Sequence, residues 1–228
     1  MKAAVITFPG SNCDHDMIYV LRDILGMTVN EIWHKDHDLR QSDLVVLPGG
    51  FSYGDYLRSG AIAQFSPVMK EVMEHARRGG YVLGICNGFQ ILCESGLLPG
   101  ALLHNDHQKF VCKNVTLRTE SKDSHITSNL SEGQLITIPI AHAEGRYYDN
   151  ADNIRKLNDH DQVLFRYTND QGIPSVEANP NGSVENIAGI TNAKRNVFGM
   201  MPHPERAADP NLGNEDGRLI LESILALA

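Results

Sequence analysis

Residues 81–95 constrain the fold more than any other part of the chain. Tyr81 to Ile85 is an apolar run that predicts a buried strand, and Phe89 to Cys93 has the apolar spacing of a helix. Between them, Gly84-Ile85-Cys86-Asn87-Gly88 has the pattern of a nucleophile elbow, a sharp strand-to-helix turn that presents its central side chain. The stretch therefore predicts an α/β sheet with a cysteine nucleophile at the end of one strand.

The elbow places Cys86 at the start of a helix, where unpaired N–H groups and the helix dipole favour a thiolate over a thiol. The backbone N–H of Asn87 would then point at an oxyanion developing on a substrate. Gly84 and Gly88 permit close backbone approach and unusual dihedral angles. The alternative is a structural cysteine buried between strand and helix, which is the usual fate of a free cysteine.

The composition argues against several classes of function. The chain carries 20 Lys and Arg against 28 Asp and Glu, a net charge of −8, which argues against a nucleic-acid or anionic membrane surface. Its four cysteines form no C-x-x-C pair, so we predict no metal site and no disulfide framework, and we expect a reducing, cytoplasmic location. No apolar stretch approaches the roughly 18 residues of a membrane span, and the N-terminal segment is expected to be a strand rather than a signal peptide.

The other apolar runs predict one α/β domain over residues 1–228. Strands at 3–8, 28–33 and 44–47 alternate with helices at 17–25 and 67–76, which implies a parallel sheet covered on both faces. Later runs predict strands at 110–119, 134–142, 163–168, 187–190 and 197–201, and a C-terminal helix around 220–225. Because many of these strands alternate in polarity, we expect a mixed or antiparallel extension, with solvated connections at 119–130 and 148–161.

A glycine-rich loop, residues 48–60, follows the strand at 44–47. Ligands of open α/β sheets bind beyond the carboxyl ends of the strands, so this loop is expected beside the elbow. Gly49 and Gly50 can turn backbone N–H groups toward an oxyanion, although an ordinary glycine-rich turn is an equally good interpretation. The loop lacks the Gly-x-x-x-x-Gly-Lys pattern of a phosphate loop.

The segment 201–206, Met-Pro-His-Pro-Glu-Arg, follows the last predicted strand. Its prolines favour a rigid, extended backbone, which places His203 and Glu205 on the same side but does not by itself bring them into contact. A thiol nucleophile needs a base held by a third group, and Cys86, His203 and Glu205 are residues of those types. Taken alone, the segment is more typical of a rigid surface turn.

Residues 47–60, 84–90 and 201–206 together resemble the triad (class I) glutamine amidotransferases. Within that family the chain is similar to the separate small glutaminase subunits of phosphoribosylformylglycinamidine synthases, over nearly its whole length. The elbow and His-x-Glu are shared widely in the family, whereas Gly-Gly-Phe-Ser-Tyr-Gly-Asp at 49–55 is more specific. The resemblance implies a three-layer, flavodoxin-like α/β fold with a mostly parallel sheet and a mixed or antiparallel extension.

The resemblance also implies the role of each motif residue. Cys86 resembles the nucleophile, His203 the general base and acid, and Glu205 the carboxylate that orients the histidine. The oxyanion would be held by backbone N–H groups near three residues, Gly50, Phe51 and Asn87.

Two further residues, Gln90 and His142, are expected to bind glutamine. Gln90 lies one helical turn after Cys86 and on the same face, although an exposed helix glutamine fits that spacing equally well. His142 lies in the segment 141–145 and is equally well explained as a hydrogen-bonded histidine at a strand end.

The resemblance implies hydrolysis of L-glutamine and ATP-driven transfer of the ammonia to formylglycinamide ribonucleotide in purine biosynthesis. The sequence contains no nucleotide-binding motif, so we expect no cofactor in this chain, and ATP and magnesium on a large synthetase subunit. A small third subunit would complete the complex. Residues 55–58, Asp-Tyr-Leu-Arg, are expected to face the partner, which would restrain wasteful hydrolysis by remodelling the loop.

Three other hypotheses compete with that of a glutamine amidotransferase. Hydrolases of the DJ-1 and intracellular-peptidase group also use a cysteine elbow, but they typically place histidine directly after the cysteine, where this chain has Asn87. A serine-type α/β-hydrolase would have a serine nucleophile and the order nucleophile, acid, histidine. The third alternative is an inert regulatory module, because a sequence does not show that the three triad residues meet.

Overall fold

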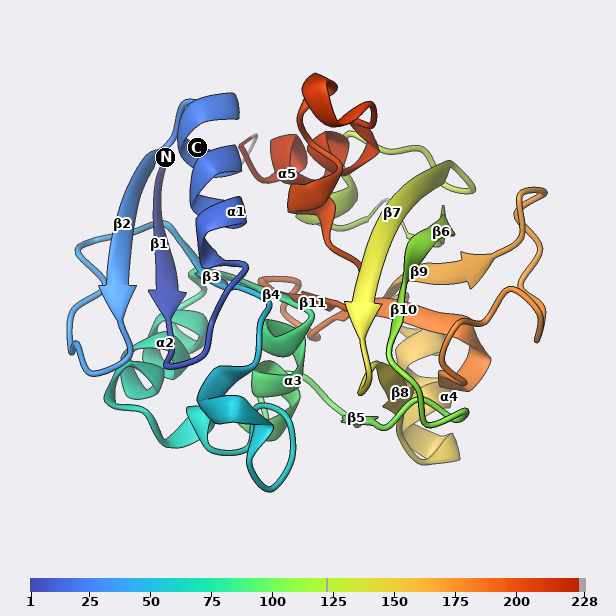
Figure 1. Ribbon diagram of the computed structural model, residues 1–228, viewed down its shortest axis with the longest axis horizontal. Helices are drawn as coiled ribbons and strands as arrows, with labels where there is room; N and C mark the ends of the chain where they lie inside the picture. Colours follow the sequence, from blue (N-terminus) through green and yellow to red (C-terminus); the bar gives the residue numbers. More distant parts are fainter. Residues whose placement is uncertain (122, 226–228) are drawn as a thin grey trace.

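The computed structural model describes residues 1–121 and 123–225, and one nine-stranded sheet runs through its centre (Figure 1). The strand order is β2-β1-β3-β4-β11-β10-β9-β6-β7. The first five strands are parallel: β2 (Thr28–Trp33), β1 (Lys2–Thr7), β3 (Leu44–Leu47), β4 (Tyr81–Ile85) and β11 (Val197–Met200). The other four pair antiparallel: β10 (Ile187–Thr191), β9 (Val163–Thr168), β6 (Val111–Thr119) and β7 (Leu135–His142). The predicted parallel sheet with an antiparallel extension is confirmed.

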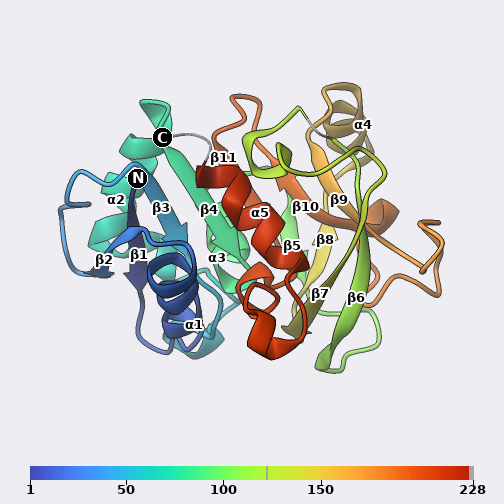
Figure 2. The ribbon, with the colours of Figure 1, turned by 90° about the horizontal axis from the view of Figure 1, so that it is seen from above.

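Helices cover both faces of the sheet, which is the middle of three layers (Figure 2). On one face lie α1 (Asp14–Tyr19), which continues as a π-helical turn at Val20–Ile24, and α5 (Asp216–Leu225). On the other face lie α2 (Pro67–Arg77) and α4 (Ala151–Asp159). The helix α3 (Asn87–Glu94) packs against β3, β4 and β11. Strands covered on both sides must be apolar throughout, and all four residues of β3 are buried.

Short elements complete the fold. A separate two-stranded antiparallel sheet pairs β5 (Ala101–Leu103) with β8 (Arg146–Tyr148). Single 3-10 turns occupy six segments: Ser52–Asp55, Ala63–Phe65, His125–Thr127, Val184–Asn186, Pro204–Arg206 and Pro210–Leu212.

The prediction of a solvated connection at 148–161 was wrong, because this segment contains α4. The Asn150 side chain accepts a hydrogen bond from the Asn153 N–H and caps the helix, and Ile154 and Leu157 are buried. These two apolar residues, three positions apart, are too few to mark a helix by periodicity. The segment 119–130 is likewise not fully solvated, since Ile126, Thr127 and Leu130 are buried.

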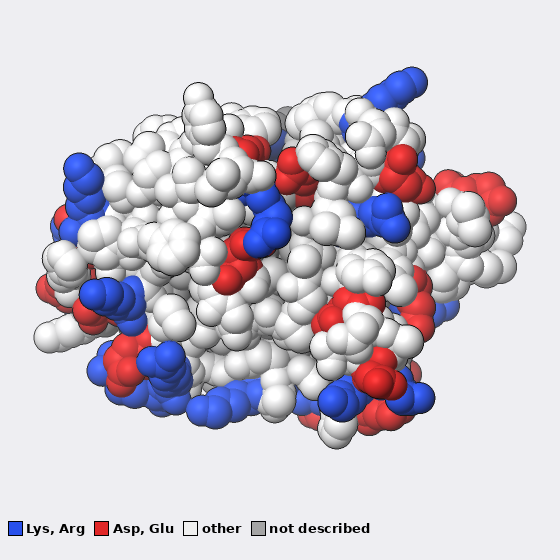
Figure 3. Space-filling model, turned by 90° about the horizontal axis from the view of Figure 1, so that it is seen from below, with Lys and Arg blue, Asp and Glu red and all other residues white. Residues whose placement is uncertain are grey.

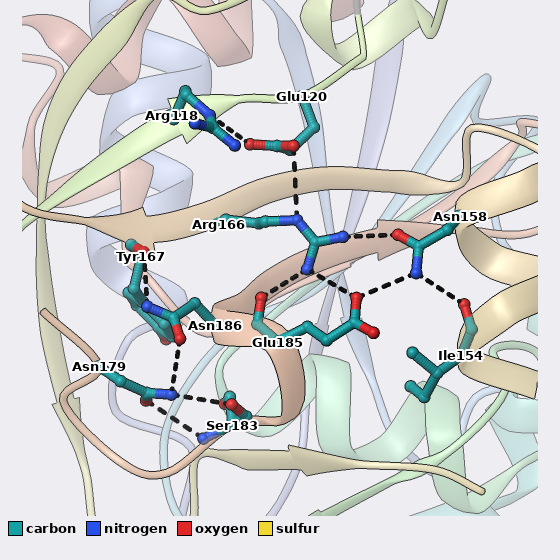
Figure 4. Close-up of polar contacts among 10 residues, drawn as sticks. All are labelled: Arg118, Glu120, Ile154, Asn158, Arg166, Tyr167, Asn179, Ser183, Glu185 and Asn186. Atoms are coloured by element: carbon teal, nitrogen blue, oxygen red, sulfur yellow. Dashed lines mark hydrogen bonds and ion pairs between the residues drawn. The ribbon is translucent and has the colours of Figure 1, made fainter. Parts of the chain in front are cut away.

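A polar network centred on Arg166 of β9 joins α4 and the 3-10 turn Val184–Asn186 to the extension (Figure 4). The guanidinium lies 3.4 Å from Glu120 and 3.3 Å from Glu185, and it donates to the Asn158 side chain of α4 at 2.6 Å. Only 11% of the Arg166 side chain is exposed, so these partners compensate for the desolvation of its charge. The network therefore fixes α4 and the turn against this side of the sheet.

The carboxyl ends of the parallel strands lie together at the bottom of Figure 1, where the arrowheads of β1 and β2 point. Because β4 lies between β3 and β11, the glycine-rich loop, the elbow and the segment after β11 leave the sheet side by side, as predicted. Figure 3 looks onto this face, on which acidic and basic side chains are mixed around a wide uncharged area. Among residues 1–121 and 123–225, no helix has the length and apolarity needed to cross a membrane.

Candidate active site

Cys86 occupies the corner of the turn between β4 and α3. Its φ of 50° and ψ of −106° fall where residues other than glycine are rarely found, so the cysteine itself holds the backbone strain of the elbow. The Cys86 N–H donates to the Met200 carbonyl at 2.8 Å, which ties the corner to the end of β11. The predicted elbow is present, but the unusual dihedral angles expected at Gly84 and Gly88 are absent, since neither residue has a positive φ.

Gly84 and Gly88 are instead needed for close packing. A Cβ atom at Gly88 would lie 1.8 Å from the Leu47 carbonyl oxygen, and one at Gly84 would lie 2.5 Å from Leu92 Cδ1. The first turn of α3 thus rests directly on the end of β3, at a distance that only glycine allows.

Replacing Gly88 with alanine should lower the free energy of unfolding by at least about 3 kcal/mol, because the new methyl group overlaps a backbone oxygen that cannot move alone. Gly26→Ala is the matched control: Gly26 has a φ of +67° and no atom within 4 Å of the added methyl group, so only about 1 kcal/mol of backbone strain is expected. Denaturant titration of both variants measures the difference, and equal losses would contradict the packing argument.

His203 and Glu205 are in direct contact. His203 Nδ1 lies 2.6 Å from Glu205 Oε1, and only 1% of each side chain is exposed. The contact forms because residues Pro204–Arg206 make a 3-10 turn that curls the carboxylate back under the imidazole. The prolines predicted an extended backbone throughout this segment, but the turn shows that residues 204–206 are not extended. The His203 N–H donates to the Pro139 carbonyl of β7 at 2.8 Å and holds the histidine in place.

The electrostatic surroundings favour a protonated His203. Burial disfavours the charge, but the Glu205 carboxylate and the neighbouring Cys86 outweigh burial and raise the pKa of His203 to about 10. Within the part of the chain that the structure describes, the buried Nε2 atom of His203 has no hydrogen-bond partner in the ordinary range. When a cysteine attacks a substrate, an imidazolium with a free N–H in the same cavity can protonate the leaving group.

Two small cavities meet at Cys86, and we call them the histidine cavity and the glutamate cavity. The histidine cavity has a volume of about 130 Å³, and its own lining residues include Asn12, Cys13, Phe110, His203 and Arg206. The glutamate cavity has a volume of about 60 Å³, and its own lining residues include Asp55, Ser59, Gln90, His142 and Glu144. The shared wall consists of Gly50, Phe51, Cys86 and Ala141.

The three residues expected at the oxyanion hole differ in how their backbones are placed. Asn87 is the first residue of α3, where helical N–H groups have no partner within the helix. Gly50 lines both cavities with a φ of +133°. Phe51 also lines both, but its N–H donates to the Gly10 carbonyl at 3.2 Å. The Phe51 N–H is therefore bonded within the protein, and its expected role at the oxyanion hole stays a prediction.

Gln90 is buried rather than exposed on the helix surface, so that alternative is excluded. Its amide donates to the Glu144 carbonyl and accepts from the Asn87 side chain, at 2.9 Å in the second case. His142 is the last residue of β7, and its ring nitrogens lie 3.2 Å from Asn105 Oδ1 and 3.5 Å from Asn181 Nδ2. Both residues line the glutamate cavity, although their side-chain hydrogen bonds are largely taken up within the protein.

The segment 55–58 faces two ways. Tyr56 and Leu57 are 74% and 92% exposed, which fits a surface that a partner covers, whereas Arg58 pairs with Glu94 at 2.7 Å. Asp55 faces inward and lines the glutamate cavity. The sequence predicted Asp55 on the partner side, which differs from this placement, whereas the segment 141–145 was expected to line the glutamine pocket, and its residues 141–144 line the glutamate cavity.

The chain is similar to known proteins over nearly its whole length. The family model of the CobB/CobQ-like glutamine amidotransferase domain matches residues 1–215. The phosphoribosylformylglycinamidine synthase subunit PurQ of Salinibacter ruber is 54% identical over 224 residues, which cover 98% of this chain and 95% of that protein. The protein of the same name from Aquifex aeolicus is 54% identical over 226 residues, covering 99% and 100%.

Solved structures give a consistent result. A chain of the structure of PurLQS from Thermotoga maritima is 44% identical, has a TM-score of 0.87, and is matched over 99% of this chain and 98% of its own length. A glutamine amidotransferase from Thermotoga maritima, 15% identical with a TM-score of 0.57 over 98% of this chain and 89% of its own, shares the fold.

Proposed function

The chain belongs to the CobB/CobQ-like glutamine amidotransferase domain family, and we propose that it is the glutaminase subunit of phosphoribosylformylglycinamidine synthase. One observation carries the chemistry: a strained, buried Cys86 shares a cavity with a His203–Glu205 pair. Relatives that carry this subunit's name match the chain from end to end, which supports the choice of complex.

The first half of the reaction forms a thioester. The Cys86 thiolate attacks the side-chain amide carbon of L-glutamine, and the carbonyl oxygen becomes an oxyanion facing the N–H groups of Asn87 and Gly50. His203 then gives its Nε2 proton to the amide nitrogen. The C–N bond breaks, ammonia leaves, and a glutamyl thioester remains on Cys86.

The second half restores the enzyme. Neutral His203 takes a proton from water, and the resulting hydroxide attacks the thioester carbonyl. The C–S bond breaks, glutamate leaves, and the thiolate and imidazolium are regenerated. Glu205 holds His203 through Nδ1, which leaves Nε2 available for proton transfer in the cavity that His203 shares with Cys86.

The ammonia would pass to a large synthetase subunit that holds ATP and magnesium and converts formylglycinamide ribonucleotide to formylglycinamidine ribonucleotide. A small third subunit would complete this cytoplasmic complex. Exposed Tyr56 and Leu57 provide apolar contacts for such a partner, and Figure 3 shows a wide area without charged residues on this side of the molecule. No cofactor is assigned to this chain.

The position of Phe51 suggests how the partner would control turnover. Its N–H has to leave the Gly10 carbonyl before it can face an oxyanion, and residues 51–58 run from that bond to the exposed Tyr56 and Leu57. Binding of the synthetase to Tyr56 and Leu57 would thus act on a loop that lines both cavities. We infer that the free chain hydrolyses glutamine slowly and the assembled complex rapidly.

The test is release of glutamate and ammonia from L-glutamine by the purified chain. It is measured alone and with the synthetase, the third subunit, ATP and formylglycinamide ribonucleotide. Release that rises at least about tenfold on assembly supports a partner-controlled glutaminase. No release even in the full mixture would instead indicate an inert regulatory module, and an unchanged rate would remove the coupling through Phe51.

A further inference from the structure

A tyrosine of the glycine-rich loop is held by a histidine and a serine from two other parts of the chain. The Tyr53 hydroxyl lies 2.7 Å from His34 Nδ1 and 2.9 Å from Ser66 Oγ. A hydroxyl can donate one hydrogen bond and accept another, so both contacts form at the same time. His34 and Ser66 are each 4% exposed, and the His34 and Tyr53 rings meet edge to face with their centroids 5.4 Å apart. We call these three residues the tyrosine anchor.

Both partners of Tyr53 are fixed in the fold. The His34 N–H donates to the Thr7 carbonyl at the end of β1, and the His34 carbonyl accepts from the Val68 N–H of α2. Ser66 directly precedes α2, at the position where a serine side chain usually caps a helix. Among the described residues, however, no N–H of α2 donates to this hydroxyl, which contacts Tyr53 instead. The serine thus forgoes a cap that would stabilise α2, which points to a role in the loop.

The backbone of the loop is strained next to the anchor. Three residues other than glycine have a positive φ within five positions: Tyr53 at 55°, Asp55 at 53° and Leu57 at 70°. Each of these conformations is less stable than an ordinary one and persists only where the surroundings hold it. The contacts of the Tyr53 side chain supply that hold at the first of the three positions.

Tyr53 lies close in sequence to the wall that the two cavities share. Gly50 and Phe51 belong to this shared wall. The next residue, Ser52, donates its N–H to the Asn87 side chain at 3.2 Å, and the Asn87 backbone N–H is an expected oxyanion donor. The backbone between the anchor and Gly50 therefore borders the place where the proposed mechanism forms its oxyanion.

We propose that the tyrosine anchor positions the backbone of Gly50 and Phe51 for stabilisation of the transition state. The proposal rests on the proposed function and adds three positioning residues to it, which act through the loop rather than on the substrate. Donors that are aimed at a developing oxyanion stabilise the transition state more than the bound substrate. Loss of the anchor therefore lowers kcat and leaves KM nearly unchanged.

The first test measures kcat and KM for L-glutamine in the assembled complex. Tyr53→Phe keeps the ring but removes both hydroxyl contacts, so kcat should fall by about 10- to 100-fold while KM changes by less than about twofold. Ser66→Ala should also lower kcat, whereas Ser66→Thr keeps a hydroxyl and should retain the unmutated value. Tyr147→Phe is the matched control, because it removes a buried tyrosine hydroxyl that donates to the Pro99 carbonyl at 3.1 Å, and it should leave kcat unchanged.

Two further measurements separate positioning from a defect in folding. Alkylation of Cys86 by iodoacetamide forms no oxyanion, so the labelling rate should be the same in Tyr53→Phe and in the unmutated protein. The double variant with Tyr53→Phe and Ser66→Ala should lose no more kcat than Tyr53→Phe alone, because both changes remove the same contact.

An unchanged kcat in Tyr53→Phe overturns the proposal. An equal fall in Tyr147→Phe, or iodoacetamide labelling that slows as much as hydrolysis, also overturns it, because either result indicates a general loss of structure. A raised KM with the unmutated kcat does the same, since the anchor would then serve substrate binding. If the unmutated complex releases no glutamate, the proposed function itself fails, which is a separate outcome.

Discussion

Replacing Cys86 with alanine is expected to lower glutamine hydrolysis by at least about 10⁴-fold in the assembled complex, because no thioester forms without the sulfur. Water held near His203 cannot substitute, since the cavity positions the amide for attack by Cys86 rather than by solvent. Glutamate and ammonia release measure the loss. Transfer of added ammonia to the acceptor by the complex should be unchanged, which is the control for intact assembly.

The free energy of unfolding provides an independent test of the backbone strain at Cys86. At a φ of 50°, glycine is strained less than any other residue, so Cys86→Gly should unfold with a free energy about 1 kcal/mol higher than Cys86→Ala. Both variants should be inactive. An alanine variant as stable as the glycine variant would show that the elbow relaxes when the sulfur is removed. Residual hydrolysis at the unmutated rate would refute the assignment of Cys86 as nucleophile.

Replacing Glu205 with glutamine is expected to lower kcat for glutamine by about 10²- to 10⁴-fold while KM changes little. The amide keeps the shape of the carboxylate but removes the charge that stabilises the His203 imidazolium at 2.6 Å. Glu222→Gln, on the surface of α5, is the matched control and should leave both constants unchanged. A Glu205→Gln enzyme with the unmutated kcat would show that the contact serves only the fold.

The pH dependence of this variant has a definite sign. Burial opposes charge on His203, whereas Glu205 and Cys86 raise its pKa to about 10, so removing the carboxylate lowers that pKa. The alkaline limb of kcat/KM should therefore move to lower pH. For stability, a raised folded-state pKa contributes fully below the ordinary value near 6.5, and the contribution is lost as the pH rises toward about 10. Unfolding at pH 6 and pH 9 should differ less in Glu205→Gln than in the unmutated protein.

The parallel core could be predicted because its signals are local. The strand at 44–47 is an uninterrupted apolar run that ends at Pro48, the strand at 28–33 is rich in β-branched and aromatic residues, and the structure places both at those residues. The elbow was also predictable, because the pattern of a cysteine between two glycines follows an apolar strand run and precedes residues with the apolar spacing of a helix. By contrast, α4 carries too few apolar residues to show a period, and β5 and β8 are three-residue strands stabilised by each other.

The site was predictable in its residue types but not in its contacts. His203 and Glu205 stood out between two prolines, yet the turn that joins them depends on the pairing of β11 with β4 and on the bond to Pro139. Likewise, the hydrogen bond from the Phe51 N–H to the Gly10 carbonyl could not be predicted, because Gly10 lies 41 positions earlier in the chain and only the fold brings the two residues together. Asp55 and Glu144 face one cavity for the same reason.

The position of β11 has a consequence for the folding of this chain during its synthesis on the ribosome. The strand nearest the C-terminus lies between β4 and β10, so the two halves of the sheet stay apart until residues 197–200 have been made. The same segment carries the acceptor for the Cys86 N–H and leads into His203, the proposed base. A growing chain on the ribosome that has not reached residue 203 therefore lacks the proposed proton donor of Cys86, and a chain terminated before that residue is expected to release no ammonia. The topology thus makes synthesis of residues 197–205 a condition for assembly of the proposed site.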